Sequence, residues 1–318
     1  MIGIDLGSNT LRVVQIDCNS GEMVAIYEKI VKTADGLIHT GKIGVEAQNR
    51  VIDAISEAKR RIGFDGDRYR AVTTEAMRQA SNRDDVLARI ERETGIVFEI
   101  ISGEEEARLT LLAVKHRLQL LGQKEKDSKK RDKKASFLLV DIGGGSTELI
   151  FDYEGDILSK SFPIGIVTVS QRYQTLEAIE GALPGLMEEM QGFCDELYAR
   201  YGKAGSFVAT AGTPTTVAAL KLGQNYATYD ARVVNGTELT VSDLNSALKQ
   251  LLAMSPGKRE IAVGVGRSDL ITAGILIFRQ LFLIAGMQEC IVIDDGLREG
   301  VALDSCNRTA NIEKKIRF

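Results

Sequence analysis

Histidine and aromatic residues are scarce in this 318-residue chain, which has two histidines, no tryptophan and only 6% aromatic residues. With only His39 and His116 available, a histidine-rich metal site or a Ser-His-Asp triad has little material. The shortage of aromatic residues disfavours stacking platforms for nucleic-acid bases. The net charge of -4 gives no overall basic character either. We therefore expect no nucleic-acid partner.

Cysteine is also sparse, and its spacing forms no recognisable motif. The four cysteines are Cys18, Cys194, Cys290 and Cys306, and none of them belongs to a CxxC pair. This spacing disfavours a zinc ribbon and a dense disulfide framework. Scattered free thiols are typical of proteins in a reducing compartment, so we expect free cysteines and a cytoplasmic location.

No segment of the sequence is typical of secretion or of a membrane span. The start, MIGIDLGSNT, lacks a basic region followed by an apolar stretch, so we expect no signal peptide. The most apolar later segment, residues 270–287, is interrupted by Arg279 and Gln280. Its pattern predicts a buried amphipathic helix rather than a membrane span, and we expect no membrane partner.

The chain contains an internal repeat. The segments IGIDLGSNTLRVVQI (residues 2–16) and LLVDIGGGSTELIF (138–151) both read as an apolar strand, Asp-x-Gly, a small polar turn and a second apolar strand. The positions that align are Asp5 with Asp141, Gly7 with Gly143, Thr10 with Ser146, and Arg12 with Glu148. Repeats of this kind indicate the architecture of the whole chain.

The order of predicted elements indicates two domains. Hairpin strands come first, and helices then alternate with strands. This order of elements occurs twice, beginning near residue 2 and again near residue 137. A length of 318 residues suits two domains of ordinary size. We expect an α/β protein with two similar domains facing a cleft that binds the ligand. The domains are expected at residues 1–122 plus about 300–318, and at 123–299, with a basic loop at 123–135 near the boundary.

The repeated turns suit an anion. Turns of small residues leave backbone N–H groups unpaired and form anion-binding nests, and the glycines at 143–145 allow a ligand to approach the main chain. The alternative is a plain hairpin turn. Asp5 and Asp141 end apolar strands, where a carboxylate is costly unless it is paired or metal-bound. A metal here is expected to have oxygen ligands, which favours Mg²⁺ or another hard divalent ion.

Other polar residues have two readings each. Arg12 could bind a phosphate and Glu148 a metal or water, or the two could form a salt bridge across the cleft. The stretch ISGEEEARL places three glutamates at a helix start, where one could act as a general base or all could interact with the helix dipole. Arg78 and Asn82, four residues apart, could line a phosphate path or lie on a solvated face. The basic run 124–134 could steer a polyanion or form a solvated loop.

Seven segments together resemble one family, the exopolyphosphatase / guanosine pentaphosphate phosphohydrolase (Ppx/GppA) family. It belongs to the superfamily of actin, sugar kinases and heat-shock chaperone ATPases. The segments follow the family's order along the chain, and they are GIDLGSNTLRVV, TTEAMRQASNRDDVL, EIISGEEEARLTLLAV, LLVDIGGGSTELI, SFPIGIVTVSQRY, TAGTPTTVAAL and IDDGLREGVALD. The resemblance implies a ribonuclease-H-like (actin-like ATPase) fold in each domain. It also implies Mg²⁺-dependent release of a terminal phosphate from polyphosphate or guanosine pentaphosphate.

The resemblance also assigns roles by position. Glu106 is similar to the family's catalytic base, and Glu148 to a catalytic group that handles metal or water. The implied metal ligands are Asp141, Glu148 and Asp5. The implied phosphate-binding residues are Gly7, Ser8, Asn9, Arg12, Arg78, Asn82, Gly143, Gly144, Gly145, Ser146 and Thr147. The chain resembles the short two-domain members of the family, and a homodimer is one possible assembly.

Two other functions remain open from the sequence. A kinase of the same superfamily would transfer the γ-phosphate of ATP to a small acceptor, with an adenosine pocket near TAGTPTTVAAL. A sensor would bind guanosine penta- or tetraphosphate without turnover and would not need Glu106. Separate incubations with ATP and polyphosphate distinguish the kinase from the hydrolase, and tight binding without turnover identifies the sensor.

Overall fold

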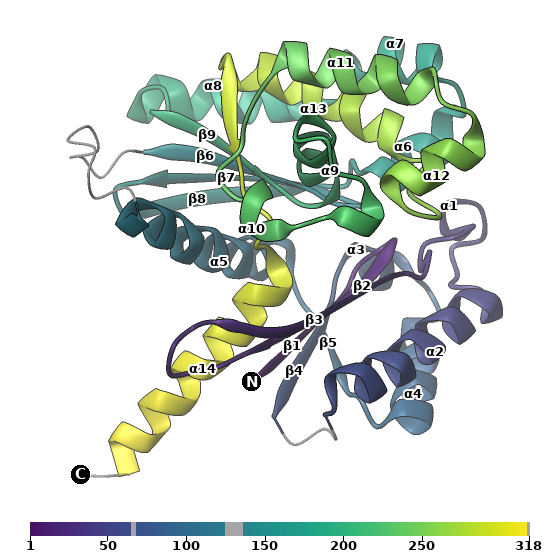
Figure 1. The fold of residues 1–318 in the computed structure, drawn as a ribbon, viewed down its shortest axis with the longest axis vertical. Helices are drawn as coiled ribbons and strands as arrows, with labels where there is room; N and C mark the ends of the chain where they lie inside the picture. Colours follow the sequence, from purple (N-terminus) through teal and green to yellow (C-terminus); the bar gives the residue numbers. More distant parts are fainter. Residues whose placement is uncertain (65–67, 125–135, 317–318) are drawn as a thin grey trace. The chain divides into compact units, whose positions relative to one another are not determined.

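The computed structural model describes residues 1–64, 68–124 and 136–316 (Figure 1). The chain divides into two compact units. The first unit comprises Met1–Ala113 and Gly296–Phe318, and the second comprises Val114–Asp295. The first stretch of unit one therefore ends inside helix α5 (Gly103–Lys124) rather than at residue 122. Beyond the last residue of α5, the basic run up to residue 134 lies outside the described residues.

The sheet of the first unit has the strand order β3-β2-β1-β4-β5. Its strands are β1 (Ile2–Leu6), β2 (Thr10–Ile16), β3 (Met23–Ile30), β4 (Tyr69–Thr73) and β5 (Phe98–Ile100). The first three strands are antiparallel neighbours, whereas β4 runs parallel to β1 and to β5. The predicted hairpin is therefore confirmed, and β3 extends it on one side.

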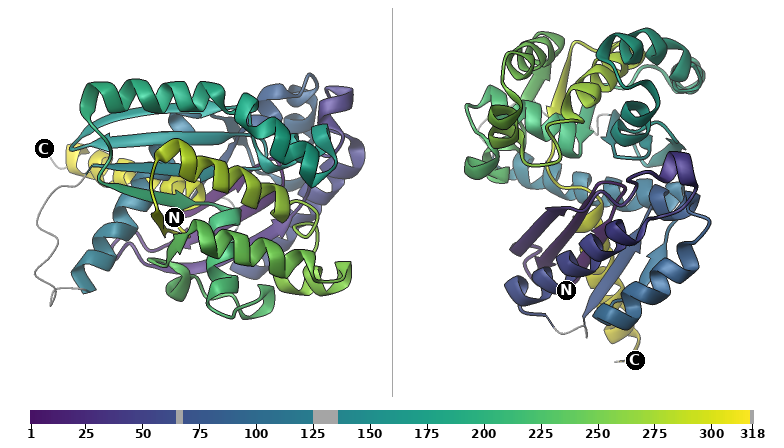
Figure 2. Two further views of the ribbon diagram at one scale, coloured as in Figure 1. Left: turned by 90° about the horizontal axis from the view of Figure 1, so that it is seen from above. Right: turned by 90° about the vertical axis from the view of Figure 1, so that its right-hand side faces the viewer.

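Helices pack on this sheet through apolar stripes. The predicted stripe of α2 (Val45–Ile62), namely Val51, Ile52, Ala54, Ile55 and Ala58, is buried throughout. Helix α2 packs against α4 (Arg83–Thr94), and the two lie side by side in Figure 1 and in the right-hand view of Figure 2. Helix α14 (Leu297–Ile316) crosses β1, where Gly3 permits the contact, because a Cβ there would lie 2.3 Å from the Arg298 carbonyl oxygen. Two short helices, α1 (Leu37–Thr40) and α3 (Glu75–Gln79), complete the unit.

The second unit repeats the same sheet with one extra strand. Its order is β10-β11-β9-β6-β7-β8. The strands are β6 (Phe137–Ile142), β7 (Thr147–Tyr153), β8 (Asp156–Phe162), β9 (Ser206–Thr210), β10 (Glu238–Thr240) and β11 (Glu289–Val292). Strands β6, β7, β8, β9 and β11 correspond in position and direction to β1 to β5. Both units thus have the ribonuclease-H-like strand order, which confirms the predicted fold class.

Helices make up much of the second unit. They are α6 (Ile166–Tyr173), α7 (Leu176–Leu186), α8 (Glu188–Tyr201), α9 (Gly212–Lys221), the 3₁₀ turn η1 (Tyr226–Thr228), α10 (Ala231–Val234), α11 (Val241–Leu252), α12 (Pro256–Val263) and α13 (Ile271–Ala285). Three of them, α6, α7 and α8, lie before residue 202. Helix α13 is mostly buried, as predicted. Across residues 1–64, 68–124 and 136–316, no helix has both the length and the apolar character needed to cross a bilayer.

The cysteines differ from the prediction. Cys18 and Cys306 form a disulfide with Cα atoms 5.3 Å apart, so the expectation of free thiols was wrong for this pair. The bond ties the β2–β3 connection to α14 within the first unit. Its partners are 288 residues apart in sequence, which is why spacing did not reveal it. Cys194 and Cys290 are free and buried.

Candidate functional site

The two repeated turns have the same geometry. In the first, the Gly7 N–H donates to the Thr10 carbonyl at 3.0 Å. In the second, the Gly143 N–H donates to the Ser146 carbonyl at 2.9 Å. A Cβ on Gly143 would lie 2.9 Å from that same carbonyl oxygen, so the second turn requires glycine at this position. The structure therefore reproduces the alignment of the two segments.

In the first unit, the chain that follows β3 holds the carbonyl groups of the first turn. The N–H groups of Val31 and Lys32 both donate to the Asn9 carbonyl at 2.9 Å. The Ala34 N–H donates to the Ser8 carbonyl at 2.8 Å. The peptide planes of the turn are thus fixed by bonds on their carbonyl side.

In the second unit, the start of α6 holds the second turn in a comparable way. The Ile166 N–H donates to the Gly143 carbonyl at 3.1 Å, and the Val167 N–H donates to the Gly144 carbonyl at 2.8 Å. Gly165 lies so close that a Cβ there would be 2.4 Å from the Gly144 carbonyl oxygen. Thr147, which is predicted to contact phosphate, also helps to hold the chain before α6 against the second turn. Its hydroxyl donates to the Ile164 carbonyl at 2.6 Å.

The opposite side of each turn offers N–H donors. Within the described residues, the backbone N–H groups of Ser8, Asn9, Gly144 and Gly145 donate no hydrogen bond. Turns whose carbonyls are fixed and whose successive N–H groups remain available form anion-binding concavities. This geometry supports the sequence-based expectation of a phosphate nest over a plain hairpin turn.

Each turn is flanked by a row of polar residues across three strands. In the first unit, Asp5 on β1 is opposite Arg12 on β2, which is opposite Glu28 on β3. Residues opposite each other in antiparallel strands share one face of the sheet. The Arg12 guanidinium lies 3.6 Å from Asp5 (Nη1 to Oδ2) and 3.5 Å from Glu28 (Nε to Oε2). Arg12 therefore pairs with the carboxylate on each side of it in the row.

Helix α14 adds charged groups that the sequence did not reveal as site residues. The Arg298 Nη1 lies 3.4 Å from Glu28 Oε2, and Arg298 also pairs with Glu299. Both α14 residues are buried. The segment IDDGLREGVALD was part of the family resemblance, but the pairing with Glu28 depends on the return of the chain across β1.

The corresponding row in the second unit carries two carboxylates. Asp141 on β6 is opposite Glu148 on β7, which is opposite Ser161 on β8. The Ser146 and Ser161 hydroxyls both donate to Glu148 Oε1, at 2.8 and 2.6 Å. Asp141 and Glu148 are buried, at 8% and 1% exposure. Where the first row has Arg12 as its middle residue, this row has Glu148.

Asp141 and Glu148 suit a hard divalent cation. Mg²⁺ is usually bound through one or two carboxylates while water and substrate phosphates fill its other positions. No group of three or more His, Cys, Asp or Glu residues that could enclose a metal occurs in the part of the chain that the structure describes. A Mg²⁺ ion would thus be held by this pair and by phosphate oxygens rather than by a closed protein cage.

Helix geometry separates the three glutamates at the start of α5. The Ser102 hydroxyl accepts the Glu105 N–H at 3.2 Å and caps the helix, as predicted. Glu104 is exposed, Glu105 forms ion pairs with Arg70 and Arg108, and Glu106 is buried at 8% exposure. Of the three, only Glu106 has the buried setting expected for a general base.

Glu106 is held by Arg78. The Arg78 Nη1 donates to Glu106 Oε2 at 2.9 Å and to the Ile101 carbonyl at 2.9 Å. Its Nε donates to Glu75 Oε2 at 2.8 Å. Burial alone would lower the pKa of the Arg78 guanidinium, but the carboxylates of Glu106 and Glu75 outweigh burial and raise it. Arg78 thus remains a cation shared by two carboxylates.

Asn82 and Arg78 do not belong to the same helix. The expectation that both are on one helical face was wrong, because α3 ends at Gln79 and Asn82 precedes α4 as its N-cap. The Asn82 side chain accepts the Ile43 N–H at 3.0 Å and donates to the Ile43 carbonyl at 3.1 Å. In this structure Asn82 therefore anchors the chain at Ile43.

A second set of carboxylates follows β11. Arg117 forms a bidentate pair with Asp295, from Nε to Oδ2 at 2.7 Å and from Nη2 to Oδ1 at 2.9 Å. The Thr210 hydroxyl donates to the Asp295 carbonyl at 2.9 Å, which ties this loop to β9. The Tyr229 hydroxyl donates to the neighbouring Asp294. Sequence reasoning assigned no role to these residues.

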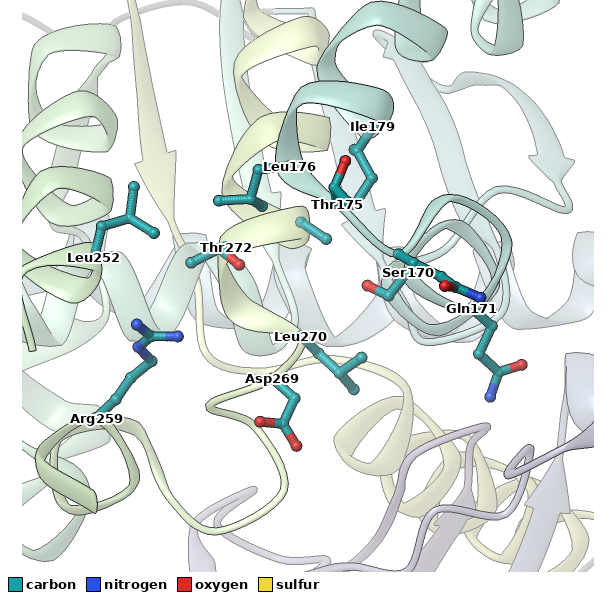
Figure 3. Close-up of a pocket in the computed structure, with 12 residues that line it drawn as sticks. Ser170, Gln171, Thr175, Leu176, Ile179, Leu252, Arg259, Asp269, Leu270 and Thr272 are labelled. Carbon is teal, nitrogen blue, oxygen red and sulfur yellow. The ribbon is translucent and has the colours of Figure 1, made fainter. Parts of the chain in front are cut away.

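A cavity of about 360 Å³ lies among the helices of the second unit (Figure 3). Its walls combine apolar side chains, such as Leu176 and Leu252, with Arg259 and Asp269. The Arg259 Nε donates to the Leu251 carbonyl at 3.0 Å, near the end of α11. This hydrogen bond gives Arg259 a structural role. None of the predicted site residues lines this cavity.

These features define a class of protein: two ribonuclease-H-like units, each with an Asp-x-Gly hairpin whose turn offers backbone donors to an anion. Residues 13–309 match the Ppx/GppA phosphatase family, and the chain belongs to this family. It is 27% identical over 323 residues to exopolyphosphatase 2 of Mycobacterium tuberculosis, covering 94% of this chain and 96% of that protein.

Two solved structures are also similar. The crystal structure of the Aquifex aeolicus member of the Ppx/GppA family has a TM-score of 0.69 and 29% identity, with 97% of each chain covered. An exopolyphosphatase from Cytophaga hutchinsonii has a TM-score of 0.79 at 23% identity, with 96% of this chain and 97% of that chain covered. The second likeness supports the fold alone.

Proposed function

We propose that this protein hydrolyses the terminal phosphoanhydride bond of inorganic polyphosphate, of guanosine pentaphosphate, or of both. The observation that carries the proposal is the second turn. It combines N–H donors, fixed carbonyls and two buried carboxylates on one sheet. A chain of phosphates needs both backbone donors and a cation, and this turn supplies the ligands for each.

Each residue has a proposed role in this reaction. The N–H groups of the two turns bind phosphate oxygens, and Arg12 adds a guanidinium beside the first turn. Asp141 and Glu148 would hold Mg²⁺ or another hard divalent ion, which would neutralise negative charge on the phosphates. Ser146 and Ser161 orient Glu148 through the hydroxyl hydrogen bonds described above.

Glu106 is the proposed general base. It accepts a proton from the attacking water as the new O–P bond forms and the bond to the leaving phosphate breaks. The products are orthophosphate and a chain shorter by one phosphate. Arg78, which already binds Glu106, keeps the carboxylate in one orientation.

A phosphate-release assay with Mg²⁺ tests the proposal. Wild-type protein should release phosphate from polyphosphate or guanosine pentaphosphate, and Glu106→Gln should lower the rate by about 10²- to 10⁴-fold, the usual contribution of a general base. The matched control is Glu104→Gln, which removes the same charge from an exposed position two residues away. Full activity of Glu106→Gln would show that another group is the base.

The same assay separates the candidate substrates. Short polyphosphate, long polyphosphate and guanosine pentaphosphate are compared side by side, with ATP plus a small acceptor as the kinase test. Phosphate release from any of the first three supports the hydrolase. Transfer from ATP to an acceptor would identify a kinase, and tight binding of guanosine pentaphosphate without turnover would identify a sensor.

A further inference from the structure

Glu75, at the start of α3, forms a compact set of contacts within the first unit. Its Oε2 accepts the Arg78 Nε–H at 2.8 Å, and its Oε1 accepts from Gln79 Nε2 at 2.6 Å. The Arg78 Nη2 also lies 2.8 Å from Glu75 Oε2. The Glu75 side chain is only 14% exposed, so the pair is shielded from most of the solvent. An i,i+3 pair at this burial is better ordered than a typical surface salt bridge.

The planar guanidinium transmits this contact to Glu106. Because the five N–H donors of arginine form a rigid fork, a carboxylate that fixes Nε also fixes the direction of Nη1. In this structure Nη1 donates to Glu106 Oε2 and to the Ile101 carbonyl, both at 2.9 Å. The orientation of Arg78 is thus defined by three acceptors: one on α3, one in the loop after β5, and one on α5.

Arg78 cannot hold Glu106 in one place unless its own position is fixed. The side chain has several rotatable bonds, and ordering it costs conformational entropy. Without Glu75, Nη1 would be the one atom that still fixes the guanidinium, through its hydrogen bonds to Ile101 and Glu106. The guanidinium could then rotate about Nη1, and the Glu106 carboxylate would move with it. Displacements of about 1 Å at a catalytic group can cost roughly a hundredfold in rate.

We infer that Glu75 is a positioning residue that orients Glu106 through Arg78. This inference rests on the proposed function, since it assigns the contact a role in hydrolysis. The Glu75 carboxylate accepts hydrogen bonds from Arg78 and Gln79, so its effect on Glu106 should pass through Arg78.

Steady-state kinetics on polyphosphate test the inference. Glu75→Ala should lower kcat by about ten- to a hundredfold, while KM changes by less than about twofold because phosphate binding is left intact. Glu75→Gln retains an acceptor for Arg78 Nε and should recover most of kcat. The control is Glu93→Ala, which removes an i,i+4 partner of Arg89 on α4 at 2.8 Å and should leave kcat unchanged.

A double-mutant cycle shows whether Glu75 acts through Arg78. In an Arg78→Ala background, Glu75→Ala should cause no further loss of kcat, because the intermediary is already gone. Equal losses in both backgrounds would overturn the inference, and so would an increase in KM with kcat unchanged. Normal kcat for Glu75→Ala in an active enzyme would overturn it as well.

A readout that needs no turnover separates this inference from the proposed function. The Arg78 Nε–H resonance, assigned by its loss in Arg78→Lys, should exchange slowly with solvent in the wild type because it is hydrogen-bonded and shielded. Glu75→Ala should speed this exchange, and Glu93→Ala should not. Unchanged exchange in Glu75→Ala would overturn the inference. An inactive wild type with the expected exchange would contradict only the proposed function.

Discussion

Asp141 and Glu148 lie directly opposite each other on β6 and β7, so their carboxylates project from the same face of the second sheet. In the first sheet the equivalent positions hold Asp5 and Arg12. One repeat therefore presents a pair of anions and the other an ion pair. We therefore propose the second row, with its two carboxylates, as the site of a hard divalent cation.

The orientation of Glu148 by Ser161 leads to the first prediction. Removing a group that orients a metal ligand usually costs about 10- to 100-fold in metal affinity. Ser161→Ala should therefore weaken Mg²⁺ binding by that factor, measured by calorimetry, and raise the Mg²⁺ concentration needed for half-maximal activity. Ser159→Ala is the matched control, since Ser159 lies on the same strand and forms no side-chain hydrogen bond among the described residues. Equal Mg²⁺ affinity in both variants would contradict the role of Ser161.

The brace beneath the second turn leads to the second prediction. A Cβ on Gly165 would lie 2.4 Å from the Gly144 carbonyl oxygen, so Gly165→Ala must displace the turn or the start of α6. We expect at least about a tenfold loss in kcat/KM and a destabilisation of about 1–3 kcal/mol from overpacking. Gly181→Ala, where an added Cβ meets nothing within 4 Å, should retain wild-type activity. A Gly165→Ala protein with normal kinetics would show that the turn tolerates movement.

The parts of the fold and the site that could be predicted from the sequence are those that depend on local patterns. The hairpins, the cap at Ser102 and the α2 stripe depend on neighbours within a few residues, where period and turn chemistry act directly. The alignment of Arg12 with Glu148 also followed from the repeat. The break between Arg78 and Asn82 was missed, although the Ser-Asn pair before Arg83 is a typical start of a new helix.

Contacts between distant parts of the chain could not be read from the sequence. Glu28 and Arg298, which are 270 positions apart in the sequence, meet only because α14 returns across β1. The bracing of the Gly144 carbonyl by Val167 requires the path of the chain after β8. A hydrogen bond of this kind joins two backbone groups and does not depend on the side chains, so it leaves no pattern in the sequence. Sequence spacing likewise holds no information on the pairing of Cys18 with Cys306.

The close approach of α14 to α5 leads to the third prediction. A Cβ on Gly300 would lie 1.9 Å from the Leu109 carbonyl oxygen, and that oxygen belongs to backbone that cannot turn aside. Gly300→Ala should destabilise the protein by at least about 1–3 kcal/mol, measured by urea unfolding. Gly122→Ala introduces the same group on α5, where nothing lies within 4 Å. It should be neutral or stabilising by up to about 1 kcal/mol, because alanine favours a helix more than glycine does. Equal effects would contradict the packing argument.

The disulfide leads to the fourth prediction. Cys18 and Cys306 close most of the chain into one loop, and loss of such a bond typically costs about 2–5 kcal/mol. A reducing agent should therefore lower the Tm of the wild type but leave a Cys18→Ser, Cys306→Ser variant unchanged. Burial raises the pKa of the Cys194 thiol to about 12, so a thiol reagent should find no reactive cysteine in the native protein and two after reduction. Reaction of Cys18 or Cys306 before reduction would contradict the pairing.

The ion pairs at the start of α5 lead to a prediction of pH dependence. Hydrogen bonds from Arg108 lower the pKa of the Glu105 carboxyl more than its partial burial raises it, and Arg70 lowers it further. Because the folded pKa lies below the ordinary value of 4.5, this stability is present above that value and is lost as the pH falls through the folded pKa. Glu105→Gln should therefore have a lower Tm than the wild type at pH 7, and the two should converge as the pH falls below the folded pKa of Glu105.

Thermal unfolding at several pH values checks this convergence. Glu104→Gln is the control, because it removes an equal charge from the same helical turn, where Glu104 is exposed and forms no ion pair within the described residues. Its Tm should follow that of the wild type at every pH. A Glu105→Gln deficit that is as large at pH 3 as at pH 7 would mean that the side chain stabilises the first unit through packing, since protonation removes only the charge.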